Sequence, residues 1–246
     1  MIDCHGDDLA GARVFWSQAL GLPVLDPDEG AAGRYALLGK GPGGWHIETH
    51  CVGHASRLHL DIEATDIEAE ADRLEGLGAK RVASPTGRWW VMQAPTGHRF
   101  CVVRWRDEEA RVPAPAVREG QGHHSALVAI VIDCQGELGP AVDFWSAALD
   151  RAVANRDPDG DGKYAELHSA ADEPFVLLQR MDHEPRVHLD IETDDLDAEV
   201  ARLEALGAQR VSFVRRWWVM QAPTGHRFCV VRQQPGKTGI VQNRWK

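Results

Sequence analysis

The sequence predicts an α+β protein made of two similar tandem domains, and three observations support this. The seventeen residues RWWVMQAPTGHRFCVVR occur at 88–104 and again, unchanged, at 216–232. Residues 57–82 and 186–211 agree at 17 of 26 positions. Each copy also combines alternating strand patterns with helical ones. The repeated unit is over 100 residues long, which is the size of a domain, because solenoid repeats have periods of about 20–50 residues.

The repeat divides the chain into four parts. We expect domain 1 at 1–106, a linker at 107–122, domain 2 at 123–234 and a C-terminal tail at 235–246. Charges, prolines and glycines with little periodicity are typical of a linker. The first strand of domain 1 is predicted to be short. Residues 239–242 of the tail are predicted to add a strand or to cover a sheet edge.

Each domain is predicted to contain two modules of one strand, one helix and three further strands. In domain 1 the apolar residues of 57–63 alternate, which indicates a strand. Asp66 suits the N-cap of the following helix and Gly78 suits its end. Strands are expected at 80–83, 89–93 and 99–104, with a turn at 94–97. Upstream we expect a helix at 8–20 and strands near 34–38 and 45–50. A second helix pattern in domain 2 covers 195–207.

Composition excludes several classes of partner. The net charge of −10 argues against binding to a nucleic-acid backbone, which requires clustered Lys and Arg. The longest apolar run, 126–132, is too short to span a bilayer, and no signal peptide is visible. The five cysteines are interpreted as reduced and mostly buried in a cytoplasmic protein.

The ordered motifs resemble those of the vicinal oxygen chelate superfamily, and most closely its glyoxalase-like domains. Each half has an Asp-Cys strand, a Phe-Trp helix, a His-Leu-Asp strand, a Leu-Gly-Ala after the second helix and a Trp-Val…Pro-x-Gly-x turn. This superfamily includes glyoxalase I, extradiol dioxygenases and bleomycin-binding proteins. The resemblance implies two half-open β-barrels, each around a cavity, with domain 2 taking the part of a dimer partner within a monomer. A homodimer is the alternative.

The resemblance also implies a divalent metal held by the first and last strands of the two modules in a domain. Such a metal acts as a Lewis acid on an oxygen-bearing substrate. The four positions in domain 1 are assigned to Met1, Glu48, His59 and Cys101, and those in domain 2 to Ile130, Leu178, His188 and Cys229. Domain 2 therefore lacks the set, and a metal is expected, if anywhere, in domain 1.

Most of these side chains also have a structural interpretation. His59 and His188 lie in the same strand motif, so each is either a strand histidine bonded to a neighbour or a ligand. Cys101 and Cys229 are either small buried hydrophobes or reactive thiolates.

The strand His46-Ile47-Glu48-Thr49-His50 is the sharpest difference between the halves. Its three titratable side chains alternate and so share one face. That face is either a site for a metal or for acid–base chemistry, or an exposed polar surface. We assign Val176, Leu178 and Arg180 as the counterparts in domain 2.

Aromatic and basic residues of the repeated segment are candidate ligand contacts. One of each adjacent pair Trp89/Trp90 and Trp217/Trp218 is expected to line a cavity that stacks flat ligands, unless all four only pack. Arg99 and Arg227 either bind an anionic group at the cavity mouth or face solvent.

Three functions remain open from the sequence. The preferred one is binding of a small, aromatic or conjugated metabolite or drug in a Trp-lined cavity, without the complete metal centre. The second is a metal-dependent lyase, isomerase or dioxygenase whose catalytic candidates are Glu48, His59 and His46. The third is a structural or regulatory protein without activity.

Overall fold

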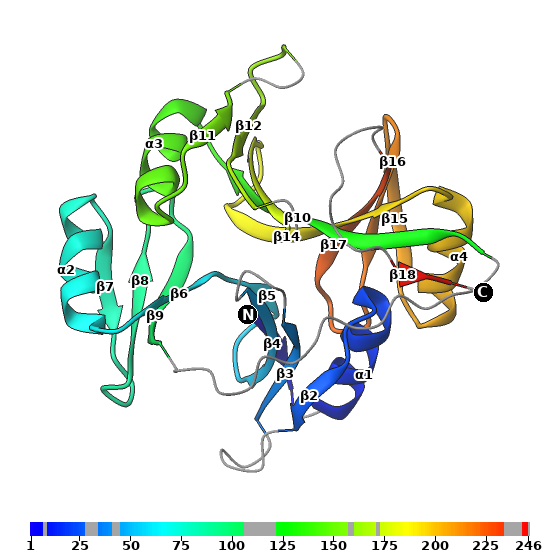
Figure 1. Ribbon diagram of the computed structural model, residues 1–246, viewed down its shortest axis with the longest axis horizontal. Helices are drawn as coiled ribbons and strands as arrows, with labels where there is room; N and C mark the ends of the chain where they lie inside the picture. Colours follow the sequence, from blue (N-terminus) through cyan, green and yellow to red (C-terminus); the bar gives the residue numbers. More distant parts are fainter. Residues whose placement is uncertain are drawn as a thin grey trace.

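The computed structural model describes residues 1–6, 9–27, 34–40, 45–105, 122–156, 160–170, 173–233 and 243–245. These residues form four modules of the predicted kind, two in each domain (Figure 1). Domain 1 begins with β1 (Ile2–His5), α1 (Leu9–Leu20), β2 (Val24–Pro27), β3 (Tyr35–Lys40) and β4 (His46–Val52). It continues with β5 (Arg57–Leu58), β6 (Asp61–Ala64), α2 (Ile67–Gly76), β7 (Lys80–Ala83), β8 (Trp89–Gln93) and β9 (Arg99–Arg104).

Domain 2 repeats this order of elements. Its first module contains β10 (His124–Cys134), α3 (Leu138–Ala148), β11 (Val153–Asn155), β12 (Tyr164–Leu167) and β13 (Phe175–Arg180). Its second module contains β14 (Arg186–Thr193), α4 (Leu196–Ala205), β15 (Gln209–Val214), β16 (Trp217–Gln221) and β17 (Arg227–Arg232). The α+β class and the two-domain arrangement are therefore confirmed. No helix in the described ranges has the length and apolar character that crossing a membrane requires.

The first strands of the modules lie side by side at the centre of the molecule. β1 pairs with β5, and β10 pairs with β14, in both cases antiparallel. A single pair, Val187 with Leu58, joins β14 to β5 and connects the sheets of the two domains. These two residues are counterparts in the repeat, so an approximate two-fold axis relates the domains and passes between them.

The helices pack across the domain boundary. One core combines α1 of domain 1 with α4 and β17 of domain 2, and the other combines α2 and β9 with α3 (Figure 1). Trp16 is fully buried, lies with its ring centroid 5.8 Å from that of Phe228, and donates from Nε1 to Thr224 Oγ1 at 3.2 Å. Trp145 repeats this with Phe100 and Thr96. The domains therefore share their hydrophobic interior.

Local signals explain most element boundaries. The Asp66 side chain accepts from the backbone N–H groups of Glu68 and Ala69, as the capping prediction requires. Gly78 ends this helical segment with φ of +99°. The predicted strand 57–63 is interrupted at 59–60, and β2, the first of the three strands expected after α1, had not been assigned a position from the sequence.

The ends of the chain agree in part with expectation. β1 has 4 residues and β10 has 11, so the first strand of domain 1 is the shorter one, as predicted. The predicted tail strand at 239–242 lies outside the described residues. Just beyond it, β18 (Asn243–Arg244) pairs with the beginning of β10, and Trp245 donates to Ser125 Oγ at 2.7 Å.

Candidate functional site

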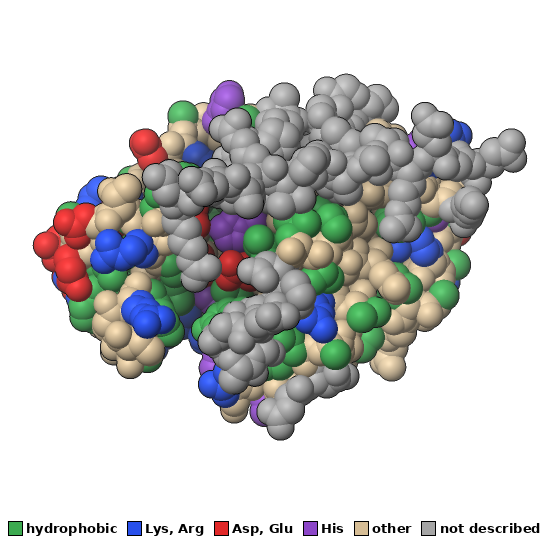
Figure 2. Space-filling view, turned by 60° about the horizontal axis from the view of Figure 1, so that its bottom comes forward, with side chains coloured by type: hydrophobic (Ala, Val, Ile, Leu, Met, Phe, Trp, Pro, Cys, Tyr) green, Lys and Arg blue, Asp and Glu red, His purple; other side chains and the backbone are tan. Residues whose placement is uncertain are grey.

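Each sheet of domain 1 has one face covered by helices and one face turned away from them, called the open face below. Side chains alternate between these faces along each strand. Ile2, Ile47 and Phe100 belong to the helix-side cores. Their neighbours in sequence therefore lie on the open face, and they include most titratable candidates. Figure 2 shows histidine side chains beside an acidic one near the middle of the face in view.

A buried carboxylate is the anchor of the site. The Asp3 side chain is 2% exposed, and its Oδ2 lies 3.0 Å from His59 Nδ1 and 3.1 Å from Arg57 Nε. Its Oδ1 lies 3.3 Å from Nδ1 of His50. Burial opposes ionisation, but the contacts with His50, His59 and Arg57 lower the pKa of Asp3 far below its usual value. Asp3 is therefore a permanent negative charge.

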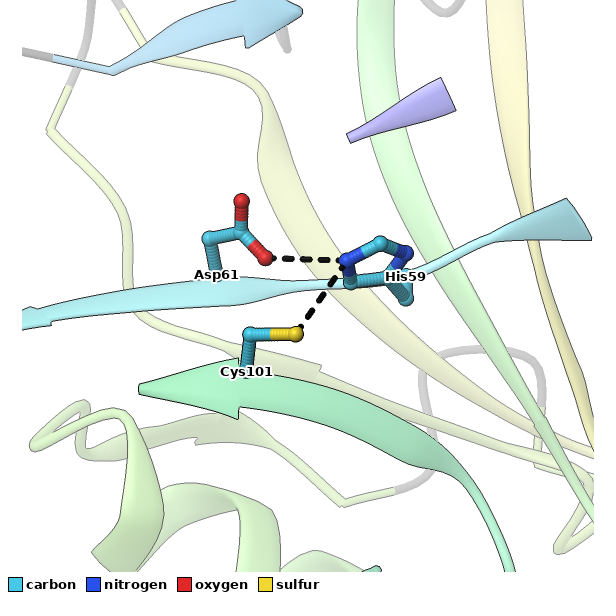
Figure 3. Close-up of side chains that lie close together, drawn as sticks. All are labelled: His59, Asp61 and Cys101. Carbon is cyan, nitrogen blue, oxygen red and sulfur yellow. Dashed lines mark hydrogen bonds and ion pairs between the residues drawn. The ribbon is translucent and has the colours of Figure 1, made fainter. Parts of the chain in front are cut away.

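His59, Asp61 and Cys101 converge beside this anchor (Figure 3). His59 Nε2 lies 3.0 Å from Asp61 Oδ1 and 3.5 Å from Cys101 Sγ. Burial would lower the pKa of His59, but the charge of Asp61 and the bonds to Asp3 and Cys101 raise it well above its usual value. In the metal-free protein, His59 is consequently an imidazolium held between two carboxylates.

Domain 2 contains the same cluster. Asp133 Oδ2 lies 3.1 Å from His188 Nδ1, and His188 Nε2 lies 3.3 Å from Asp190 Oδ1. Cys229 completes the second group of three ligand-type atoms. Both histidines thus have the neighbour contacts that the structural interpretation predicts. The cluster alone does not distinguish the domains.

The domains differ on the strands next to the clusters, and the sequence alignment of these strands was wrong by one residue. Asp3 pairs with His50, whereas Asp133 pairs with Gln179. The counterparts of His46, Glu48 and His50 are therefore Phe175, Leu177 and Gln179, and not Val176, Leu178 and Arg180. By the same register Met1 corresponds to Val131 and not to Ile130. For β4 and β13 the sequence could not reveal this shift, because both alignments place apolar residues opposite His46 and Glu48, whereas the repeated Ile-Asp-Cys motif already places Met1 opposite Val131.

The corrected alignment sharpens the contrast between the two open faces. In domain 2, Phe175 and Leu177 pack against the apolar side chains Val128 and Val131. In domain 1, His46 Nε2 lies 3.6 Å from Glu48 Oε1, and these side chains are 23% and 26% exposed. Domain 1 has an accessible acid–base pair where domain 2 has an apolar cluster.

Tyr35 connects this pair to the cluster. Its ring stacks on His50 with centroids 4.1 Å apart and planes 8° apart. Burial, and then the negative charges of Glu48, Asp3 and Asp61, raise the pKa of Tyr35. Because all three charges act on one phenol, the three carboxylates lie close to Tyr35. The raised pKa keeps Tyr35 protonated, so its hydroxyl group can donate a hydrogen bond.

The tryptophan pairs divide as expected between the two faces. Trp90 donates from Nε1 to Glu68 of α2 and lies under Arg81, and Trp218 lies under Arg210 and beside Phe213. Trp90 and Trp218 are therefore on the helix side, which corrects their place among the candidate ligand contacts. Trp89 and Trp217 have the opposite parity and are half-buried on the open faces.

Arg99 and Arg227 have the same parity as Cys101 and Cys229, as predicted. Both line a cavity between the domains, so they are more than solvent-facing surface residues. Neither this cavity nor a second one beside α2 is lined by any of the four tryptophans.

The cluster His59–Asp61–Cys101 fits a metal by its donor chemistry. Imidazole, carboxylate and thiolate all bind zinc-like ions at about 2.0–2.3 Å, which places tetrahedral ligand atoms roughly 3.3–3.7 Å apart. The observed separations of 3.0 and 3.5 Å are close to this. Asp3 holds His59 by Nδ1, which leaves Nε2 toward the other two donors, as in carboxylate–histidine–metal arrangements. Glu48 does not join this group of three.

Comparison with known proteins agrees with this architecture. The sequence model of the glyoxalase-like domain matches residues 1–103 and 129–231. The chain belongs to the glyoxalase-like domain family. This confirms the resemblance to the vicinal oxygen chelate superfamily, and the two matched segments confirm the tandem repeat. No curated protein sequence matches the chain.

Solved structures show the same fold at low identity. The 2,2′,3-trihydroxybiphenyl 1,2-dioxygenase of Sphingomonas wittichii is 17% identical, with 94% of this chain and 88% of that chain covered and a TM-score of 0.57. The Mn(II)-bound glyoxalase of Novosphingobium aromaticivorans is 15% identical, with 96% and 87% covered and a TM-score of 0.57. A variant of homoprotocatechuate 2,3-dioxygenase from B. fuscum is 16% identical, with 97% and 73% covered and a TM-score of 0.62.

Two residues of the site were not singled out from the sequence. Asp3 and Asp61 belong to the Ile-Asp-Cys and His-Leu-Asp motifs that mark the fold, and both recur in domain 2 as Asp133 and Asp190. The signal that the sequence offered was an aspartate repeated in both domains, close to a histidine that is also repeated.

Proposed function

We propose that this glyoxalase-like protein binds a small aromatic or conjugated molecule on the open face of domain 1, without needing a complete metal centre. The observation that carries the proposal is the half-accessible His46–Glu48 pair where domain 2 has Phe175 and Leu177. In this proposal domain 2 stabilises domain 1 through their shared cores.

The side chains of the open face suit such a ligand. Trp89 offers a flat surface for stacking on this face. The Tyr35 phenol donates a hydrogen bond, while the Glu48 carboxylate accepts from a ligand hydroxyl. The dioxygenase of Sphingomonas wittichii, which has a similar fold, is named for a hydroxylated biphenyl. A molecule with adjacent hydroxyl groups on an aromatic ring is therefore the first probe, and catechol is the simplest one.

A metal-dependent lyase, isomerase or dioxygenase is the second candidate, because the geometry of His59, Asp61 and Cys101 favours it. A divalent ion there would act as a Lewis acid on a bound oxygen. Binding it requires His59 to give up its proton and Cys101 to be a thiolate, so metal affinity would increase with pH.

Metal analysis combined with a binding titration separates the two candidates. The protein is purified without chelators or a histidine tag, and its divalent metals are counted by mass spectrometry. The preferred function predicts less than about 0.1 ion per chain and tryptophan fluorescence that catechol quenches in the presence of EDTA. An ion held at a stoichiometry near one and lost in His59→Ala, together with catechol binding that EDTA abolishes, would favour the metal candidate and overturn the preferred one.

A further inference from the structure

A cavity of about 360 Å³ lies at the seam between the two domains. This volume is within the range of about 300–1,000 Å³ that small-molecule sites occupy. Its lining consists of counterparts from the two halves of the repeat: Ser56, Arg57, Leu58, Gly97, His98 and Arg99 from domain 1, and Pro185, Arg186, Val187, Gly225, His226 and Arg227 from domain 2. The cavity therefore lies on the approximate two-fold axis.

Among the residues that the structure describes, the lining contains four arginines and no acidic residue. Arg57 and Arg186 are each neutralised in part from behind, since their Nε atoms lie 3.1 Å from Asp3 Oδ2 and 2.9 Å from Asp133 Oδ2. Asp3 and Asp133 are in turn shared with His59 and His188. The cavity at the seam is consequently positively charged, although the whole chain has a net charge of −10.

Arg99 and Arg227 have unmet hydrogen-bonding capacity. Nη1 of each guanidinium is buried and has no hydrogen-bond partner within the described ranges of the chain. A buried charged donor without a partner is costly, because it has lost its water and gained nothing in exchange. The same cost occurs at both of these arginines, which line one cavity, and an anionic ligand there would supply acceptors for their guanidinium groups.

We propose that the seam cavity binds one small dianion that carries an anionic group at each end, with the guanidinium of Arg99 taking one group and the guanidinium of Arg227 taking the other. Arg57 and Arg186 add positive charge beside them. Carboxylate and phosphate oxygens both match the guanidinium fork. The site is separate from the open face of domain 1, and its occupation does not depend on the function proposed there.

Isothermal titration calorimetry with two probes, glutarate and inorganic pyrophosphate, tests the proposal at constant ionic strength. At least one of them is expected to bind with one site per chain, because a single cavity serves both domains. Acetate, which has only one anionic group, is expected to bind at least tenfold more weakly than glutarate. Tighter binding of glutarate identifies a carboxylate ligand, and tighter binding of pyrophosphate identifies a phosphate ligand.

The repeat offers a matched control. Arg99→Gln with Arg227→Gln removes two charges from the cavity, and Arg88→Gln with Arg216→Gln removes two charges from exposed positions of the same segments. The cavity pair is expected to weaken the probe at least about 100-fold, since loss of one charge-assisted bond costs about tenfold or more. The exposed pair should change it less than twofold. Arg99→Lys with Arg227→Lys keeps the charge and loses the fork, and should give an intermediate affinity even if the glutamine pair folds poorly.

Three results would overturn the proposal. One is that neither glutarate nor pyrophosphate binds. Another is that two sites per chain are found, because this would place the anion within each domain. The third is equal weakening by the cavity pair and the exposed pair, because general charge would then explain the binding. Replacement of His46 and Glu48 should leave the affinity of the seam unchanged.

Discussion

The stability of this protein should increase with pH in the range below about 6.5, because of two histidines at the seam. His98 and His226 are 4% and 3% exposed. Nε2 of His98 donates to the carbonyl oxygen of Arg186, and Nε2 of His226 to that of Arg57, both at 3.2 Å. Burial lowers the pKa of each imidazole below 6.5, so both are neutral in the folded protein while the unfolded chain takes up protons.

The magnitude follows from proton linkage. Well below pH 6.5, but above the folded pKa values, the unfolded state binds up to about two more protons at these sites than the folded state. The free energy of unfolding should therefore change by up to about 2.7 kcal/mol per pH unit, twice the value of about 1.36 for one proton. His59 and His188, whose pKa values are raised, are protonated in both states here. Their contribution is lost only as the pH rises through their folded pKa values, above 6.5.

Urea denaturation at a series of pH values measures this slope. The variant His98→Gln with His226→Gln should lose most of it, although it is less stable at pH 7 because its seam bonds are weakened. Replacement of the exposed His168 by Gln controls for the loss of an imidazole. A wild-type slope near zero, or a slope unchanged in the double variant, would refute the reasoning.

Two further predictions concern backbone and thiols. Gly21 has φ of +67°, and a Cβ there would overlap the Asn243 side chain, whereas Gly136 has φ of +77° and open space around it. Gly136→Ala should cost about 1–2 kcal/mol because of its left-handed backbone. Gly21→Ala should cost about 1–3 kcal/mol more, because the added methyl group overpacks against Asn243, and Asn243→Ala should remove this excess. Equal costs of the two glycine variants in urea denaturation would contradict the packing. Burial raises the pKa of Cys4 and Cys134 to about 12. Neither thiol should therefore react with a disulfide reagent at pH 8 until the protein unfolds. Labelling of either cysteine in the folded protein, detected by mass spectrometry, would contradict this prediction.

Much of the fold could be predicted because the same pattern of strands and helices occurs twice in the sequence. The strands at 80–83, 89–93 and 99–104 were predicted with the observed bounds, since glycine and proline turns delimit them. The packing of α1 on α4 could not be predicted, because an amphipathic face does not specify its partner. The break in the strand at 59–60 was also missed, since the apolar alternation continues through it.

The candidate site was predicted only in part, because a local pattern does not show which side chains it brings into contact. His59 and Cys101 were chosen from motif positions, but the residues that fix their chemistry, Asp3 and Asp61, looked like parts of fold motifs. Trp90 could not be separated from Trp89, because parity shows that two neighbours differ in face but does not show which of them is outside.

The most direct test of the central claim uses the residues of domain 2 to redesign domain 1. His46→Phe with Glu48→Leu gives its open face the side chains found at Phe175 and Leu177, and Phe175→Leu in domain 2 is the control. Calorimetric titration with catechol should show one site per chain in the wild type and the control, and binding at least about tenfold weaker in the redesigned protein. Unchanged binding in a folded redesigned protein would contradict the claim that the open face of domain 1 is the working site.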